Sequence, residues 1–565
     1  MAILISKSNF DNSEKINNYF IHNRFKVYND RYYYHIIGEV YNISVTELLE
    51  LIVSKKIQEM KNICGDFSII VYDMKEDTIF YLNDKAGRNI VYYSRKNHLT
   101  ISDDFWSIIK HDEYTLKDVN NIELKTQLFF SASTTYSTLI KGINIFENAI
   151  YMNFNTNVLE KTKYWYFKLI ENDLTIDEKY DQLDNALNES FKTIYKFNKE
   201  DIVYGIGVSG GMDSRIIPHY AFKNNMKLKS FIIGEEKPNI LLKSNDHTSS
   251  DLVVNYFNLE HMKLEFDELS YHEKNKIDCT FNPIGSSQIF KIPNINKCDF
   301  DVLLTGSSGF IVGSSPFYSK NKTLDLLDTL FIQQSDLKLK VKFYKIKKAL
   351  NYLFGDVFDI KDIIEDYINN IITKTETEEI RKNLQRYIDS LEKLTHTEKL
   401  MNYSIGILGQ KNKSGAFESL VNHKKDYTPY TPFLLDTVQT WTEDDIYDRK
   451  IFEDFIRIRL PQLANIKQQN HKPSVDVNQP NIFQKVLSLS TYVIRGQGVM
   501  NYNNWAKQKE FKLFIKKELN ENNYISKYVD IYKIQKLVNS NQLNADVLAN
   551  CIKMNTILSM IDSKK

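Results

Sequence analysis

Residues 209–215, read as S-G-G-M-D-S-R, have the composition of a phosphate-binding turn. They follow an apolar run at 202–208 and precede a predicted helix. Glycines let the backbone approach a ligand closely, and free amides at a helix start attract anions. The hydroxyls of Ser209 and Ser214 add donors, and the carboxylate of Asp213 can hold Mg²⁺ that bridges phosphate oxygens. A lone Gly-Gly would indicate only a strand–turn–helix junction, whereas the full pattern predicts a pyrophosphate site.

The elements around this turn predict a parallel sheet. Three further β-rich runs follow 202–208, at 228–233, 261–266 and 301–305, with a predicted helix at 249–258. Strands that alternate with helices imply right-handed β-α-β units. Ligands of such sheets bind at the carboxyl ends of the strands, which is where we expect Ser209.

Helical patterns flank the predicted sheet. Residues 176–197 repeat an apolar side chain every four positions (Leu183, Leu187, Phe191 and Tyr195), which is typical of an amphipathic helix. Residues 320–400 and 500–565 also have long charged amphipathic stretches. We expect them to be helical.

The first 168 residues predict a different architecture. Short β-rich runs at 32–37, 67–72, 78–82 and 91–94 are punctuated by Gly, Asn and Asp. This pattern favours an antiparallel sheet. A helix expected at 45–59 would cover it.

The composition is that of an ordinary globular protein. The chain has 565 residues, of which 42% are hydrophobic and 26% charged. The net charge of +1 gives no general attraction to nucleic acid or to an anionic membrane. The four cysteines form no C-x-x-C pair, the eleven histidines show no metal-ligand spacing, and the start of the chain has no signal-peptide pattern. We therefore expect a cytoplasmic protein with reduced thiols and no membrane segment.

The S-G-G-x-D-S pattern is the PP-loop signature, and the chain resembles the asparagine synthetase family. Further similar segments occur in the family's order, namely G-E-V-Y-N at 38–42, G-D-F at 65–67, N-D-K-A-G at 83–87, T-I-S-D at 100–103, Y-W at 164–165, T-P-F-L-L-D at 431–436 and R-L-P at 459–461. Each segment alone is weak. Their order and spacing together make the resemblance specific.

The resemblance implies an α/β protein with two domains. Residues 1–168 would form a glutaminase-like α+β sandwich of the N-terminal-nucleophile (Ntn) hydrolase type. Residues 175–565 would form a PP-loop parallel-sheet synthetase domain with extra C-terminal helices. In this family ATP activates a substrate carboxylate as an acyl-adenylate with release of pyrophosphate, and an amine then displaces AMP to form an amide.

The resemblance also implies site residues. Asp213 would hold Mg²⁺, and Arg215 would contact phosphate or a substrate acid unless it lies on the helix surface. The family has a charge-stabilising lysine after its L-P segment, and both Lys467 and Lys472 fit this role, although either could be a solvated surface group. Residues expected to contact ATP are Val208, Ser209, Gly210, Gly211, Asp213, Ser214, Arg215, Ile233, Gly234, Gly306 and Ser307.

Two departures from the family change the expected chemistry. Glutamine-dependent members need a cysteine directly after the initiator Met, and this chain has Ala2. We therefore predict no glutaminase activity. The family's G-E-G-x-D-E segment reads T-G-S-S-G-F-I-V-G at 305–313, so its acidic positions fall on Ser307, Phe310 and Ile311. The glutamate and arginine that precede P-F-L-D in the family fall near Thr428 and Tyr430. Glu418, Asp426 or another acid could substitute from a neighbouring position.

Three functions remain open. The first is an ATP-dependent ligase that joins a carboxylate to an amine whose source is not glutamine, as β-lactam synthetases and lasso-peptide cyclases do. Its substrates would be small molecules, peptides or sugar acids. The second is a catalytically degenerate nucleotide-binding or partner protein, and the third, disfavoured by Ala2, is asparagine synthetase itself. His247 and His261 flank the expected pocket, where we expect structural roles.

Overall fold

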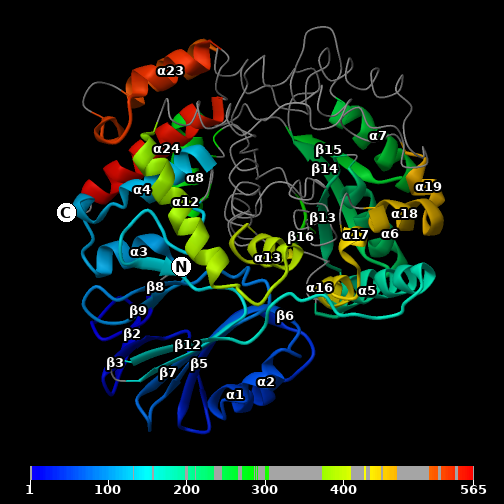
Figure 1. The fold of residues 1–565 in the computed structure, drawn as a ribbon, viewed down its shortest axis with the longest axis horizontal. Coiled ribbons are helices and arrows are strands. Elements are labelled where there is room, and N and C mark those ends of the chain that lie inside the picture. Colours follow the sequence, from blue (N-terminus) through cyan, green and yellow to red (C-terminus); the bar gives the residue numbers. More distant parts are fainter. Residues whose placement is uncertain are drawn as a thin grey trace.

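The computed structural model describes most of the chain (Figure 1). The described residues are 3–130, 133–155, 158–197, 201–209, 211–233, 245–264, 270–285, 287, 289, 299–304, 372–408, 425–427, 433–446, 450–466, 508–519, 523–540 and 545–563.

Two six-stranded antiparallel sheets form the N-terminal region, residues 3–163, which is called the N-terminal or first half below (blue and cyan in Figure 1). The first has the order β10 (Ile143–Ile145), β8 (Tyr92–Ser94), β9 (Thr100–Ser102), β1 (Ile3–Ser6), β3 (Tyr19–His22) and β2 (Ser13–Ile16). The second has the order β12 (Val158–Lys163), β11 (Ile150–Asn155), β7 (Thr78–Asn83), β6 (Gly65–Asp73), β5 (Tyr32–Val40) and β4 (Lys26–Tyr28).

The alternation of side chains along β6 explains how these sheets stack. Successive strand residues point to opposite faces. Ile70 and Tyr72 join the core between the two sheets, whereas Ile69 and Val71 join the core on the outer face. Helices α1 (Val45–Val53) and α2 (Ile57–Met60) cover that outer face, and α3 (Phe105–His111) and α4 (Asn121–Phe130) pack with residues of the first sheet. The half is therefore a sandwich of two sheets with helices outside.

A five-stranded parallel sheet forms the second half (green in Figure 1). Its order is β15 (Glu260–Leu264), β14 (Lys227–Ile233), β13 (Val203–Gly207), β16 (Val302–Leu304) and β17 (Lys425–Tyr427). Helices α5 (Ile176–Phe197) and α6 (Met212–Lys223) share one hydrophobic core with β13, and α7 (Asn245–Phe257) precedes β15. The other helical segments of this half are α13 (His396–Tyr403), a π-helical turn (Ser404–Leu408), α16 (Phe433–Val438), α17 (Glu443–Ile446), α18 (Lys450–Arg459) and α19 (Pro461–Ala464).

C-terminal helices complete the core beside α3 and α4. Helix α24 (Ala545–Asp562) packs between α4 and α8 (Tyr271–Phe281), with α12 (Lys374–Asp389), α22 (Lys509–Glu518) and α23 (Ile531–Asn539) in the same region (Figure 1). Asn550 Nδ2 donates to the carbonyl of Leu128 at 3.3 Å. Lys553 Nζ lies 3.2 Å from Asp278 Oδ1, and both side chains are fully buried. Residues that are distant in the sequence therefore share one interior.

The structure confirms the α/β class, with antiparallel sheets first and a parallel sheet later. The helix expected at 176–197 is α5, and the runs at 32–37, 67–72 and 78–82 lie in β5, β6 and β7. The single helix expected at 45–59 is wrong. Helix α1 ends at Val53, Lys55 adopts φ +54°, and α2 starts afresh at Ile57. The division at 168/175 stays a prediction. None of the described helices has the length and apolar character needed to cross a membrane.

Candidate functional site

The predicted phosphate-binding turn begins at the carboxyl end of the central parallel strand. Val208 follows β13 and donates its amide to the carbonyl of Phe231 at 2.9 Å. From β13 the chain moves first to β14 and β15 on one side, and then to β16 and β17 on the other. The strand order therefore reverses beside β13, the topological switch point at which open parallel sheets bind ligands.

Helix α6 starts in this turn without a side-chain cap. Its N-cap residue is Gly211, with φ −68° and ψ 164°, and no side chain accepts a hydrogen bond there as a cap. The amide of Gly211 lies 3.5 Å from Ser209 Oγ, which is at the limit of a hydrogen bond. The first amides of a helix have no partner within the helix. This start therefore has the chemistry of an anion site.

Two polar side chains of the predicted site occupy the first turn of α6. Asp213 is half-buried there. Ser214 is buried and donates its hydroxyl to the carbonyl of Gly211 at 2.9 Å. The Ser214 proton is thus used inside the helix start, and only its oxygen lone pairs remain for a ligand.

Arg215 does not lie on the helix surface, which was one of its two predicted positions. Its side chain is fully buried. Its Nη1 donates to the carbonyls of Leu463 and Ile466, both at 2.8 Å. Burial lowers the pKa of the guanidinium to about 10. Nη1 therefore ties α6 to the end of α19 rather than to a phosphate.

Helix α19 is also held from α7. Tyr256 Oη donates to Gln462 Oε1 at 2.5 Å. The segment before Lys467 is thus fixed from two helices of the parallel-sheet half.

The structure locates only part of the predicted site. Ile233 ends β14, next to β13, and Asp426 lies on β17. The remaining predicted positions lie outside the described residues, namely Ala2, Gly210, Gly234, Gly306, Ser307, Glu418, Lys467 and Lys472.

His261 has the structural role that was expected. Its Nδ1 lies 2.9 Å from Ser230 Oγ on β14, and its Nε2 lies 3.4 Å from Ser250 Oγ on α7. Burial lowers the pKa of His261, which favours the neutral ring. The ring therefore links β14, β15 and α7.

A contact that joins the two halves has no signal in the sequence. Lys85 follows β7, is almost fully buried, and places its Nζ 2.6 Å from Asp436 Oδ1 on α16. The same ammonium lies over the ring of Trp165 at 5.7 Å. Residues 83–87 and 431–436 each resemble a segment of the asparagine synthetase family, but no pattern within either segment predicts that they meet.

The turn that carries Lys85 is built on a buried carboxylate. Asp84 accepts the amides of Phe67, Ala86 and Gly87 at 2.8–3.0 Å. Burial, and next the proximity of Asp66, raise the pKa of Asp84 to about 7. This carboxylate fixes the turn from which Lys85 reaches the second half.

Comparison with known proteins shows a similarity between the N-terminal region and glutamine amidotransferase domains. Residues 38–165 match the family model of the glutamine amidotransferase domain. The glutamine-hydrolysing asparagine synthetase 2 of Bacillus subtilis (strain 168) is 22% identical over 188 residues, which is 31% of this chain and 25% of that protein. The match thus spans a quarter of the length of this relative.

Two solved structures share low similarity with the chain. Glutamine phosphoribosylpyrophosphate amidotransferase from B. subtilis, complexed with ADP and GMP, is 10% identical over 38% of this chain and 49% of that one, with a TM-score of 0.16. NMN synthetase from Francisella tularensis is 12% identical over 40% of this chain and 98% of that one, with a TM-score of 0.17. The protein therefore carries a region similar to glutamine amidotransferase domains, at residues 38–165, and is related at low identity to an asparagine synthetase.

Proposed function

We propose that this protein is an ATP-dependent ligase that activates a carboxylate and joins it to an amine that does not come from glutamine. The observation that carries the proposal is the position of the S-G-G-M-D-S turn. It follows β13 at the switch point of the parallel sheet and opens into α6, whose start has no side-chain cap. A nucleotide pyrophosphate is a ligand that fits amides, hydroxyl oxygens and a carboxylate in this order.

The residues at this turn fit ATP with Mg²⁺. The amides that follow Gly211 would hold phosphate oxygens, and the half-buried Asp213 would hold the metal ion. ATP supplies the adenylyl group that makes the carboxylate reactive. The chain's own residues orient the phosphates, and Arg215 holds the segment that leads to Lys467 close to α6. We assign Lys467 or Lys472 to charge stabilisation.

The source of the amine follows from residue 2. With Ala2 in place of a cysteine, the first half lacks the thiolate that attacks a glutamine amide. We propose that it serves as a scaffold, joined to the second half through Lys85 and Asp436. The amine would then come from a substrate, and the expected substrates are small molecules, peptides or sugar acids.

A second function is favoured by the residues after β16. The family's acidic positions fall on Ser307, Phe310 and Ile311, which cannot hold a metal ion through carboxylates. A protein that binds nucleotide without catalysis would agree with this loss.

ATP–pyrophosphate exchange distinguishes the two functions. Full-length protein with Mg²⁺ is assayed against a panel of carboxylates and amines, and ATP binding is measured in parallel. We expect exchange that depends on one carboxylate and is lost in Asp213→Ala. Binding without exchange would move the assignment to the non-catalytic function, and no binding would refute both.

Asp201→Ala is the matched control for this experiment. Asp201 lies just before β13, and its side chain is 88% exposed and paired with Lys227. Asp201→Ala removes the same charge as Asp213→Ala, but near the opposite end of β13. We expect exchange to be unchanged.

A further inference from the structure

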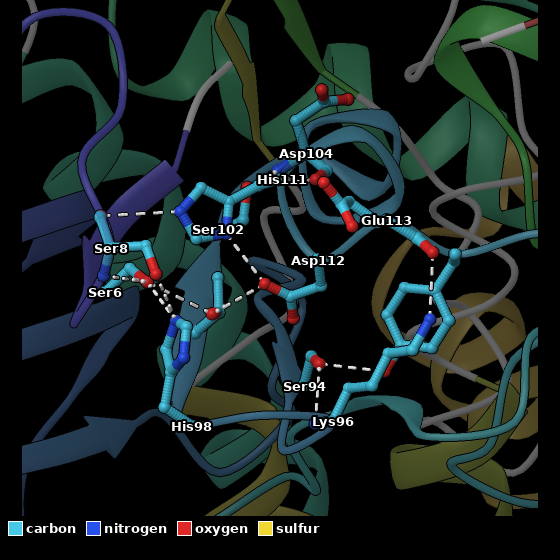
Figure 2. Close-up of polar contacts among 12 residues, drawn as sticks. Ser6, Ser8, Ser94, Lys96, His98, Ser102, Asp104, His111, Asp112 and Glu113 are labelled. Carbon is cyan, nitrogen blue, oxygen red and sulfur yellow. Dashed lines mark hydrogen bonds and ion pairs between the residues drawn. The ribbon is translucent and has the colours of Figure 1, made fainter. Parts of the chain in front are cut away.

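Three side chains of types that often bind metal ions lie together beside the first antiparallel sheet, away from the parallel sheet. His98, His111 and Asp112 each offer one ligand atom, and the three atoms lie within 4.8 Å of one another. Figure 2 shows where they come from. His98 lies in the turn between β8 and β9, and His111 ends α3 with Asp112 directly after it. The spacing of these three residues in the sequence matches no metal-binding motif. They meet because α3 folds back onto β9.

Neighbouring strands hold this group in place. Ser6 on β1 lies with its Oγ 2.8 Å from His98 Nε2 (Figure 2). Thr100 on β9 donates to Asp112 Oδ1 at 3.0 Å. Ser6 and Thr100 are both fully buried. The ligand side chains are therefore supported by hydrogen bonds from two paired strands, as the ligands of metal sites usually are.

Asp112 provides a reason for a cation at this position. Its side chain is 2% exposed, and Oδ2 is buried without a hydrogen-bond partner among the described residues. A buried carboxylate is costly unless a positive charge or several donors satisfy it. His111 Nδ1, at 2.7 Å from Oδ1, is the group bonded to it that can carry a positive charge. A divalent ion would meet the same need more fully.

The two imidazoles are close to the separation that one ion requires. Their planes meet at 86° and their centroids are 5.9 Å apart. For two rings on one tetrahedral Zn²⁺, with Zn–N bonds of about 2.0–2.1 Å, the centroids would lie about 5 Å apart. The observed separation exceeds this value by about 1 Å, so at least one of the two rings would move when the ion binds. Ser8 Oγ, 3.3 Å from His98 Nε2, and the Ser8 carbonyl, 3.4 Å from His111 Nε2, add oxygen atoms at the rim.

We propose that His98, His111 and Asp112 form a binding site for one divalent transition-metal ion of the zinc type. Two imidazoles and a carboxylate are a donor set that suits Zn²⁺ and disfavours Mg²⁺ or Ca²⁺. The bound ion would join the end of α3 to the turn between β8 and β9, and its role would be structural. This site does not depend on the nucleotide chemistry proposed above.

Cobalt titration of the full chain tests this site. After treatment with a chelator, the wild type is titrated with Co²⁺, whose visible d–d bands report a tetrahedral nitrogen–oxygen environment, and Zn²⁺ is then added to displace it. We expect one ion per chain and at least tenfold weaker binding in His98→Gln and in Asp112→Asn. His272→Gln is the matched control, because His272 is 63% exposed on α8 and should leave binding unchanged.

Thermal unfolding gives an independent measurement. Because a ligand that binds the folded state stabilises it, Zn²⁺ should raise the Tm of the wild type and not that of His98→Gln. The absence of a one-to-one cobalt spectrum in the wild type would overturn the proposal, and that titration needs no variant to fold. Equal affinity in the wild type and in a folded His98→Gln would also overturn it.

Discussion

The start of α6 in the parallel-sheet half differs from the starts of α1 and α3 in the N-terminal half. In the N-terminal half, Ser44 caps α1 with a reciprocal pair of hydrogen bonds to Glu47, and Asp104 caps α3 by accepting the amide of Ser107 at 2.9 Å. In the parallel-sheet half, α6 starts at Gly211, which has no side chain with which to cap it. Both kinds of start occur in well-packed helices, so the missing side-chain cap of α6 does not result from poor packing of that helix.

At the start of α6, none of the described side chains caps the first amides of the helix. A side-chain cap contributes about 1 kcal/mol and satisfies one of the free amides. Helices α2, α19 and α22 also lack one, but of these four helices α6 is the one that begins at the carboxyl edge of the parallel sheet. A helix start without a side-chain cap at the topological switch point fits a binding site in which a phosphate accepts hydrogen bonds from the first amides of the helix.

Closing the α6 start should have the largest effect. Gly211 has φ −68°, which any residue accepts, so Gly211→Asp can place a carboxylate where it caps the first amides and repels phosphate. We expect about a 1,000-fold loss of ATP affinity, roughly 4 kcal/mol, with the Tm unchanged or slightly raised. Calorimetric titration with ATP and Mg²⁺ measures the affinity without any knowledge of the second substrate.

The reverse change in the other half is the control. Ser44→Ala removes a cap from α1 and should cost about 1 kcal/mol of stability, while ATP affinity stays the same. If Gly211→Asp bound ATP as the wild type does, the difference between the two helix starts would have no functional meaning.

A smaller effect is expected from the buried side of α6. Arg215→Met would leave the carbonyls of Leu463 and Ile466 without their donor. Hydrogen bonds to charged groups contribute about 1.5–3 kcal/mol each, so we expect a stability loss of about 3 kcal/mol in urea unfolding. Arg459→Met is the control, because Arg459 forms exposed ion pairs with Asp177 and Asp181 and its loss should cost less than about 1 kcal/mol. Equal losses would show that α19 is not held through Arg215.

The smallest effect concerns pH and belongs to the N-terminal half. Burial, and next the charge of Arg24, lower the pKa of His35 to about 4, against a weaker opposing effect of Asp103. The unfolded chain therefore binds a proton between pH 6.5 and about 4 that the folded chain does not. Stability is complete above the unfolded value and falls as the pH decreases through this window.

A variant tests this sign. The ring centroids of His35 and Phe25 lie 5.6 Å apart, so another aromatic ring fits at this position. His35→Phe should show a smaller decrease in Tm than the wild type when the pH falls from about 7 to about 5. His272→Phe, at an exposed position, should behave like the wild type. A larger decrease in His35→Phe would contradict the assignment.

Local patterns predicted the elements well and their long-range contacts poorly. Apolar residues at every fourth position predicted α5 with its observed bounds, because the burial of one helix face follows from the local sequence. Helix α1 ended early because Lys55 adopts a left-handed conformation that no repeat indicates.

The site was predictable to the same extent. The turn after β13 lies where the pattern placed it. The direction of Arg215, however, depends on carbonyls about 250 positions later in the sequence. The contact between Lys85 and Asp436 likewise depends on how two distant segments pack.

The position of α24 has a consequence for the time course of folding in the cell. Asn550 contacts the carbonyl of Leu128, and these residues are 422 positions apart. At a synthesis rate of about 5–20 residues per second, α4 leaves the ribosome roughly 20 to 80 s before the helix that covers it. For that interval the apolar side of α4 has no partner from α24. We therefore expect nascent chains of intermediate length to depend on chaperones, and this dependence should end once α24 has emerged.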